Sequence, residues 1–173
     1  MAIDLTLKST SITNREATPR VLSSANSLGD GVVRCVSGYI ASVTASLTTT
    51  SIIRLCEVPS NAKVLMVKIF SEAQTAGAFD VGIYRNNTDG GANVSKTLFG
   101  SAVSCAAAVL GTDITQEAGS PATYTIAKMH QPLWQAAGAS VDPKSTYDVA
   151  ATVTTTDVTT GTGALGVQVW YTL

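Results

Sequence analysis

The residue types that most often carry out chemistry are sparse in this chain. His130 is the only histidine among 173 residues, and its neighbours in the segment KMHQP include no acidic or nucleophilic side chain. A catalytic histidine needs such a partner within hydrogen-bond reach, so we interpret His130 as a surface or capping residue. The sequence contains no GxSxG, HExxH, P-loop or dinucleotide-binding motif.

Carboxylates and thiols are the remaining candidates for chemistry. Asp142, Asp148 and Asp157 could meet across loops and act as a pair, but with one histidine and no motif a small hydrolase is the weakest hypothesis. The thiols are odd in number, widely spaced and without a CxxC pair: Cys35, Cys56 and Cys105. This pattern favours buried free thiols. We therefore expect no enzyme activity, no metal site and no cofactor.

The overall composition points to a protein that packs against other chains. Hydrophobic residues make up 45% of the chain and charged residues 13%, compared with roughly 25% charged residues in ordinary soluble domains. A surface with few charges repels other molecules only weakly, which suits a protein that works in an assembly. A Thr-rich monomeric sandwich fits the composition equally well. The net charge is −1 and the Lys and Arg residues are scattered, so we expect no direct contact with nucleic acid.

Targeting signals are also missing from the sequence. The start MAIDLTLKST lacks the basic and apolar segments of a signal peptide, and no apolar run approaches the roughly 18 residues of a membrane span. We expect synthesis in a cytoplasm and no membrane association.

Strand patterns dominate the chain and are centred on residues 58–85. There, Ala62–Glu72 forms an apolar run, and Phe79, Val81 and Ile83 then alternate with small or polar residues. Similar strands are predicted over residues 31–43, 51–58, 147–153 and 165–171. We predict an all-β fold: a two-sheet antiparallel sandwich of jelly-roll type. The apolar members of the alternating runs give the predicted core: Val33, Leu55, Val67, Ile69, Val81, Ile83, Val149, Val153, Val167 and Val169.

One or two short helices are expected to interrupt the strands. Alanines and apolar residues three or four apart predict a helix over residues 96–110, with a strand over 98–104 as the alternative. Tyr124–Ala127 is predicted as a brief strand. Gln131–Ala137 is predicted as a helix, with Pro132 in its first turn and Gly138 at its end.

The first thirty residues are predicted to form an extended amino-terminal arm, followed by the sandwich domain at residues 31–173. The arm is polar and rich in turn residues, and it cannot build a core. It nevertheless carries strand-spaced apolar residues and two arginines that could bind a neighbouring subunit: Ile3, Leu5, Leu7, Arg15 and Arg20. A frayed terminus or a first edge strand is the alternative.

Apolar residues on both faces of several strands predict self-association. The strands at residues 32–40, 52–58 and 64–70 offer two apolar faces, although a monomeric sandwich needs one. In the last strand, Trp170 points away from the predicted core set. Contiguous exposed apolar surface usually marks an interface. We predict a homodimer or homotrimer with Trp170 in or beside the contact.

Four segments also carry a family resemblance: SITNREATPRV, RLCEVPSNAKV, DVGIYRNNTDGGA and YTIAKMHQPLWQAAGASVDPKSTYDVAATVTT. From about Ser11 onward the chain resembles small proteins encoded by tailed bacteriophages near the major capsid gene, and these are similar to jelly-roll cement, or head decoration, proteins. The resemblance implies a non-enzymatic virion protein on the capsid exterior that binds the major capsid protein, made in the bacterial host cytoplasm. It brings no catalytic residues.

Besides the hydrolase, one other function remains as an alternative to the cement protein. Jelly rolls also serve as lectins, so a carbohydrate- or receptor-binding module on the virion is the alternative. Four aromatic residues could stack on sugars in such a module, although core and interface packing is the commoner use: Trp134, Trp170, Tyr84 and Tyr147.

Overall fold

A computed structural model describes residues 17–19, 31–42, 47–74, 77–117, 124–154 and 163–173. The chain divides into two units, Met1–Val33 and Arg34–Leu173. Most of the first unit lies outside the described residues, so the fold is that of the second unit. Among the described residues, no helix is long and apolar enough to cross a membrane.

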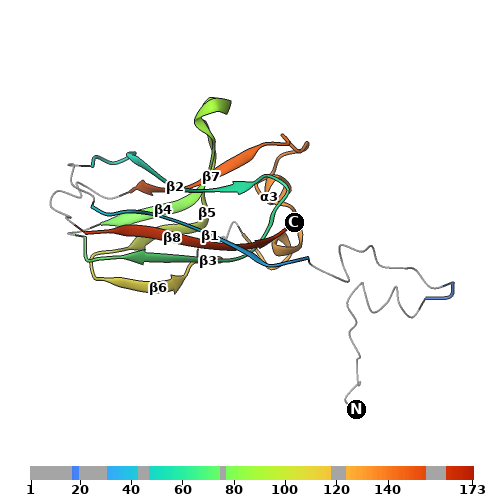
Figure 1. Cartoon of the computed structure of the whole chain (residues 1–173), viewed down its shortest axis with the longest axis horizontal. Coiled ribbons are helices and arrows are strands. Elements are labelled where there is room, and N and C mark those ends of the chain that lie inside the picture. The colour runs from blue at the N-terminus through green and yellow to red at the C-terminus, as the bar shows by residue number, and fades with distance from the viewer. Residues whose placement is uncertain (1–16, 20–30, 43–46, 75–76, 118–123, 155–162) are drawn as a thin grey trace, which may run out of the picture. The chain divides into compact units, whose positions relative to one another are not determined.

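Eight strands form two four-stranded antiparallel sheets that pack face to face (Figure 1). In chain order they are β1 (Arg34–Ile40), β2 (Ile52–Pro59), β3 (Lys63–Ser71), β4 (Ala78–Arg85), β5 (Asn93–Ser104), β6 (Val109–Asp113), β7 (Thr146–Val153) and β8 (Leu165–Thr172). One sheet has the order β1-β8-β3-β6 and the other has the order β2-β7-β4-β5.

This strand order is that of a jelly roll. Every connection except the one from β4 to β5 passes from one sheet to the other, so strands that are neighbours in sequence face each other across the core. All six strand pairs are antiparallel. The predicted two-sheet sandwich of jelly-roll type is confirmed.

The core lies between the sheets and contains most of the residues predicted from alternation. Eight of the ten are buried, because each points inward from a strand whose alternate residues face outward. Val33 was predicted wrongly: it precedes β1 and its side chain is 55% exposed. Leu55 is only half-buried, because β2 shifts its register between Arg54 and Cys56.

One end of the sandwich is closed by two short helical segments, η2 (Lys128–His130) and α3 (Leu133–Ala136) (Figure 1). The amide of Leu133 donates a hydrogen bond to the carbonyl of Ala62, and the buried hydroxyl of Tyr124 donates one to the carbonyl of Val64. The predicted helix at residues 131–137 is therefore confirmed in shortened form. The predicted strand at Tyr124–Ala127 is wrong, because this segment turns into η2.

The helix predicted over residues 96–110 is also wrong, since this stretch contains most of β5 and the start of β6. Opposite β4, the register of β5 jumps from Ser95, which pairs with Ile83, to Gly100, which pairs with Val81. Ala102 then takes a positive φ of 52°, which a helix does not allow. Pairing with β4 thus overrides the helix propensity of the alanines, and the strand alternative at residues 98–104 is correct.

Candidate interaction surface

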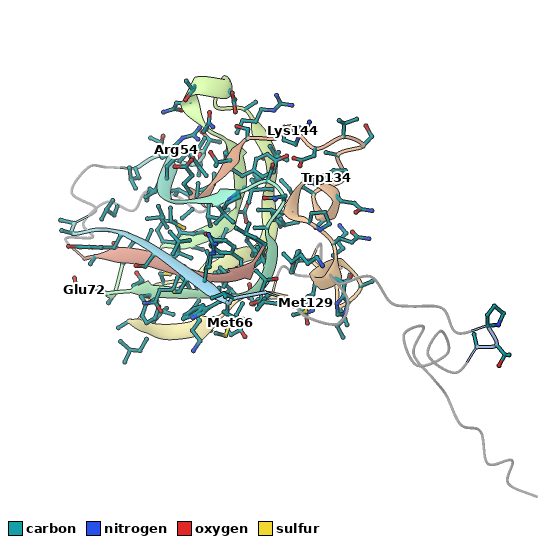
Figure 2. All side chains as sticks on the ribbon, turned by 45° about the vertical axis from the view of Figure 1, so that its right-hand side comes forward. Arg54, Met66, Glu72, Met129, Trp134 and Lys144 are labelled. Carbon is teal, nitrogen blue, oxygen red and sulfur yellow. The ribbon has the colours of Figure 1, made fainter. Side chains whose placement is uncertain are left out.

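Each sheet has an outer face, and the two differ in character. Figure 2 shows Arg54 and Met66 on opposite outer faces. We call the outer face of the β1-β8-β3-β6 sheet the apolar face. Strand pairing arranges its residues in three rows: Cys35, Trp170 and Met66; then Ser37, Gln168, Lys68 and Asp113; then Tyr39, Gly166, Phe70 and Leu110.

The third row forms an exposed apolar patch. The side chains of Tyr39 and Leu110 are 75% and 89% exposed, and Phe70 is half-buried between their strands. Gly166 forms the floor between Tyr39 and Phe70, and a Cβ atom placed there would lie 3.0 Å from the Cβ of Tyr39. Two shallow depressions, both lined by Tyr39, Phe70 and Gly166, open at this place. Exposed aromatic side chains beside a hollow are typical of interface anchors.

Trp170 faces outward from β8, away from the buried Val167 and Val169, as its position in the sequence predicted. It is half-buried, and the Nζ atom of Lys68 lies 5.6 Å from the centre of its ring, in a cation-π arrangement. Its place on the apolar face is therefore established, while its part in a subunit contact stays a prediction.

The other predicted interface residues lie in the amino-terminal arm and outside the described residues: Ile3, Leu5, Leu7, Arg15 and Arg20. Their grouping with Trp170 therefore stays a prediction. Sequence reasoning missed Tyr39, Phe70 and Leu110. The outward phase of Phe70 was readable, but Tyr39 has the same strand phase as Val33, which was predicted in the core, and Leu110 lay in the predicted helix at residues 96–110. The pairing of β1, β8, β3 and β6 places the three in one row.

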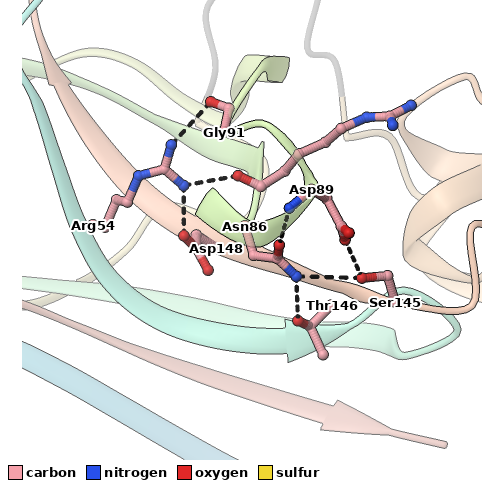
Figure 3. A network of polar contacts seen from close by, with 8 residues as sticks. Arg54, Asn86, Asp89, Gly91, Ser145, Thr146 and Asp148 are labelled. Carbon is pink, nitrogen blue, oxygen red and sulfur yellow. Dashed lines mark hydrogen bonds and ion pairs between the residues drawn. The ribbon is translucent and has the colours of Figure 1, made fainter.

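We call the outer face of the β2-β7-β4-β5 sheet the polar face, because its side chains bond to one another. Arg54 forms an ion pair with Asp148 and donates to the carbonyls of Arg85, at 2.8 Å, and Gly91, at 2.9 Å (Figure 3). Its guanidinium also lies 5.7 Å from the ring centre of Tyr84. One arginine thus joins β2, β7 and the loop that follows β4.

Two further contacts complete the polar face. The hydroxyl of Tyr84 bonds to that of Thr152 at 2.6 Å, and both residues are buried. The buried carboxylate of Asp80 accepts a hydrogen bond from the amide of Ala102 at 3.0 Å and pairs with Lys96 at 3.3 Å. Buried polar groups are costly unless they are bonded, so these contacts let the outer face stand without a partner.

The loop after β4 is held to β7 by the same kind of contact (Figure 3). The side chain of Asn86 accepts from the amide of Asp89 at 2.7 Å and donates to the hydroxyls of Ser145 and Thr146 at 3.3 and 3.2 Å. Ser145 also donates to Asp89. The short helix η1 (Asn87–Asp89) and the glycines that follow it are thus part of a fixed corner.

The candidates for chemistry that the structure describes do not form a reactive cluster, and Asp157 lies outside the described residues. His130 is exposed at the end of η2. Asp142 accepts from the hydroxyl of Ser60 at 2.6 Å and from the amide of Lys144, and these bonds lower the pKa of its carboxyl. Among the described residues, no three metal-binding side chains come together.

All three cysteines are free, but they differ in burial. Cys105 is buried as predicted, whereas Cys35 is exposed on the apolar face, so that prediction was wrong for Cys35. Burial, with the negative charge of Asp148 next in importance, raises the pKa of Cys56 to about 12. A thiol with so high a pKa is unreactive at neutral pH.

Comparison with known proteins gives a structural likeness only. No family model matches the chain. No curated protein matches it either. A chain of the cyanophage Pam1 capsid asymmetric unit is 20% identical, with a TM-score of 0.51 over 83% of this chain and 86% of that chain. A chain of the capsid of Ralstonia phage GP4 is 16% identical, with a TM-score of 0.57 over 82% and 84%. The chain therefore shares its fold with chains of two phage capsids.

Proposed function

We propose that this chain is a structural virion protein, a capsid cement or decoration protein that binds the outside of the major capsid protein shell and stabilises it. The observation that carries the proposal is the jelly-roll fold shared with chains of two phage capsids. The low charge content and the exposed apolar face add support, because both suit a protein that works packed against other chains.

Binding to capsids tests the proposal. Purified chain mixed with shells of the major capsid protein should sediment with the shells and raise their resistance to heat. Images of shells with and without the chain should differ by added density on the exterior. A chain that stays in the supernatant at high micromolar concentration would exclude the cement role.

The amino-terminal arm is proposed to act in assembly. Deleting residues 1–28 should change the free energy of unfolding by no more than about 1 kcal/mol, as for residues without buried contacts, and should weaken capsid binding or oligomerisation. If the truncated protein unfolds, the arm is an integral part of the fold and its proposed role is wrong.

Self-association through the apolar face is the second part of the proposal, with a homodimer or homotrimer as the expected state. Trp170→Ala should weaken association by roughly 2 kcal/mol or more if this side chain is an anchor. A wild-type chain that stays monomeric at high micromolar concentration by light scattering would contradict it.

A carbohydrate- or receptor-binding role is the alternative. It has less support from the aromatic side chains, because Trp134 packs partly against the core and Trp170 lies beside Lys68. Glycan binding that is lost in Trp134→Ala or Trp170→Ala would reverse the order of the two functions.

A further inference from the structure

We propose that two copies of this chain pair through their apolar faces about a two-fold axis that runs along β8. The proposal deepens the self-association part of the proposed function, on which it rests. It names the partner as a second copy and states which rows of side chains meet.

The first step is the pairing that the axis produces in the third row. With the axis along β8, each row of one copy lies opposite the same row of the other copy. Strand β1 of one copy lies opposite β3 of the other, and β8 lies opposite β8. Tyr39 of each copy then faces Phe70 of its partner, with Gly166 of both copies between the two aromatic pairs. Aromatic pairs across an interface stabilise it beyond the area that they bury. The exposed Leu110, one strand further out, covers the outer side of each pair.

The absence of a side chain at Gly166 matters for this fit. The depressions around Gly166 are lined by Tyr39 and Phe70, so each copy has a hollow on the axis with an aromatic side chain on either side. The axis brings the two hollows together, which leaves room between the copies for the rings of Tyr39 and Phe70 on either side. The same patch then serves both partners, as a two-fold contact requires.

The charges of the middle row select this axis over the alternative. An axis across the strands through the middle row would place Lys68 against the second Lys68 and Asp113 against the second Asp113. Like charges that face each other across an interface oppose its formation strongly. The axis along β8 instead places Lys68 opposite Ser37 and Gln168 opposite Gln168, whose amides can each donate and accept. It also aligns the strands of the two copies, the common way for sheets to pack.

Crosslinking at the axis tests the pairing. In a Cys35→Ser background, Gln168→Cys places one thiol of each copy near the axis, where a short bis-maleimide can bridge the roughly 10 Å between packed sheets. We expect Gln168→Cys to give a crosslinked dimer of the full-length chain. The matched control is Glu57→Cys, an exposed position on the polar face, which should stay monomeric on the gel. The parent Cys35→Ser protein should also give no dimer, because its other thiols are half-buried and buried.

A second measurement keeps the test independent of the crosslinker. Phe70→Ser should weaken dimerisation at least about 30-fold by sedimentation equilibrium, the effect expected of an interface anchor. Circular dichroism should show that the variant keeps its β structure. The pairing is overturned if the chain is monomeric, if Phe70→Ser dimerises as tightly as wild type, or if Glu57→Cys crosslinks as well as Gln168→Cys.

Capsid binding separates this inference from the proposed function. Wild-type chain that binds shells as a monomer would overturn the two-fold dimer and leave the cement role in place. A dimer with the expected crosslink that fails to bind shells would do the reverse.

Discussion

On the polar face the guanidinium of Arg54, the hydroxyl of Tyr84 and the carboxylate of Asp80 all have partners within the same chain. On the apolar face Tyr39 and Leu110 direct large side chains into solvent. Both faces belong to sheets of one sandwich with a common core. The difference is the one we expect if the polar face stands alone and if another chain covers the apolar face, as proposed above.

The strongest way to break the polar face is to add a side chain at Gly82. A Cβ atom there would lie 2.0 Å from the carbonyl oxygen of Ser95, so Gly82→Ala must push β5 away from β4. We expect the free energy of unfolding to fall by about 3 kcal/mol or more, measured by urea denaturation. The matched variant is Gly166→Ala on the apolar face, where the nearest atom is the Cβ of Tyr39 at 3.0 Å. A loss at Gly166→Ala as large as at Gly82→Ala would contradict the comparison.

The second largest effect is expected at Asp148. Asp148→Ala removes the carboxylate that pairs with Arg54 and leaves a partly buried guanidinium with carbonyl partners only. We expect a loss of roughly 1–3 kcal/mol in the free energy of unfolding. Glu57→Ala provides the control, because Glu57 is an exposed carboxylate directly opposite Asp148 in the sheet. Equal effects of the two substitutions would show that the ion pair adds nothing.

The strands and the sandwich could be predicted because the alternation of apolar and polar residues along a strand indicates which side chains face the core. Trp170 was placed correctly on the outside for the same reason. The helix predicted over residues 96–110 failed because alanine content and apolar spacing describe a chain in isolation. Here the lack of a side chain at Gly82 lets Ser95 pass close to β4, and Leu98 and Phe99 are both buried in a strand that has lost its alternation.

The apolar face could be predicted only in part. The outward phase of Phe70 followed from its strand, whereas Tyr39 and Leu110 were hidden by the wrong predictions of Val33 in the core and of a helix at residues 96–110. The three also come from different strands, and no local pattern links them. Their row depends on strand order and register, which in turn depend on contacts between distant parts of the chain. The amino-terminal residues predicted to join the interface stay a prediction.

High pH offers a further contrast between two thiols, that of Cys56, which packs against the core, and that of Cys35, which is exposed on the apolar face. The pKa of Cys56 is raised from its ordinary value of 9.0 to about 12 in the folded chain. Between these values the unfolded chain releases this proton first, so stability should be complete below about pH 9 and should fall as the pH rises towards 12. Thermal unfolding from pH 8 to 11 checks this. In the same range a maleimide should label the exposed Cys35 well before Cys56, and equal labelling would contradict the burial of Cys56.

The smallest effect on folding is expected on the apolar face. Leu110→Ser changes a side chain that is 89% exposed, so the free energy of unfolding should stay within about 0.5 kcal/mol of wild type. Chemical denaturation at a concentration where the chain is monomeric measures it. A larger loss would mean that Leu110 is already covered within one copy.

The most direct test is side-chain oxidation footprinting of the full chain at low and high concentration. Tyr39, Phe70, Leu110 and Trp170 all carry oxidisable side chains on the apolar face, and Ile52 provides an exposed reference on the polar face. If the apolar face is where a second copy binds, oxidation of the first set should fall on concentration while that of Ile52 stays constant. Protection of Ile52 with unchanged oxidation of Tyr39 and Phe70 would contradict the account, because it would show that the chain associates through the polar face.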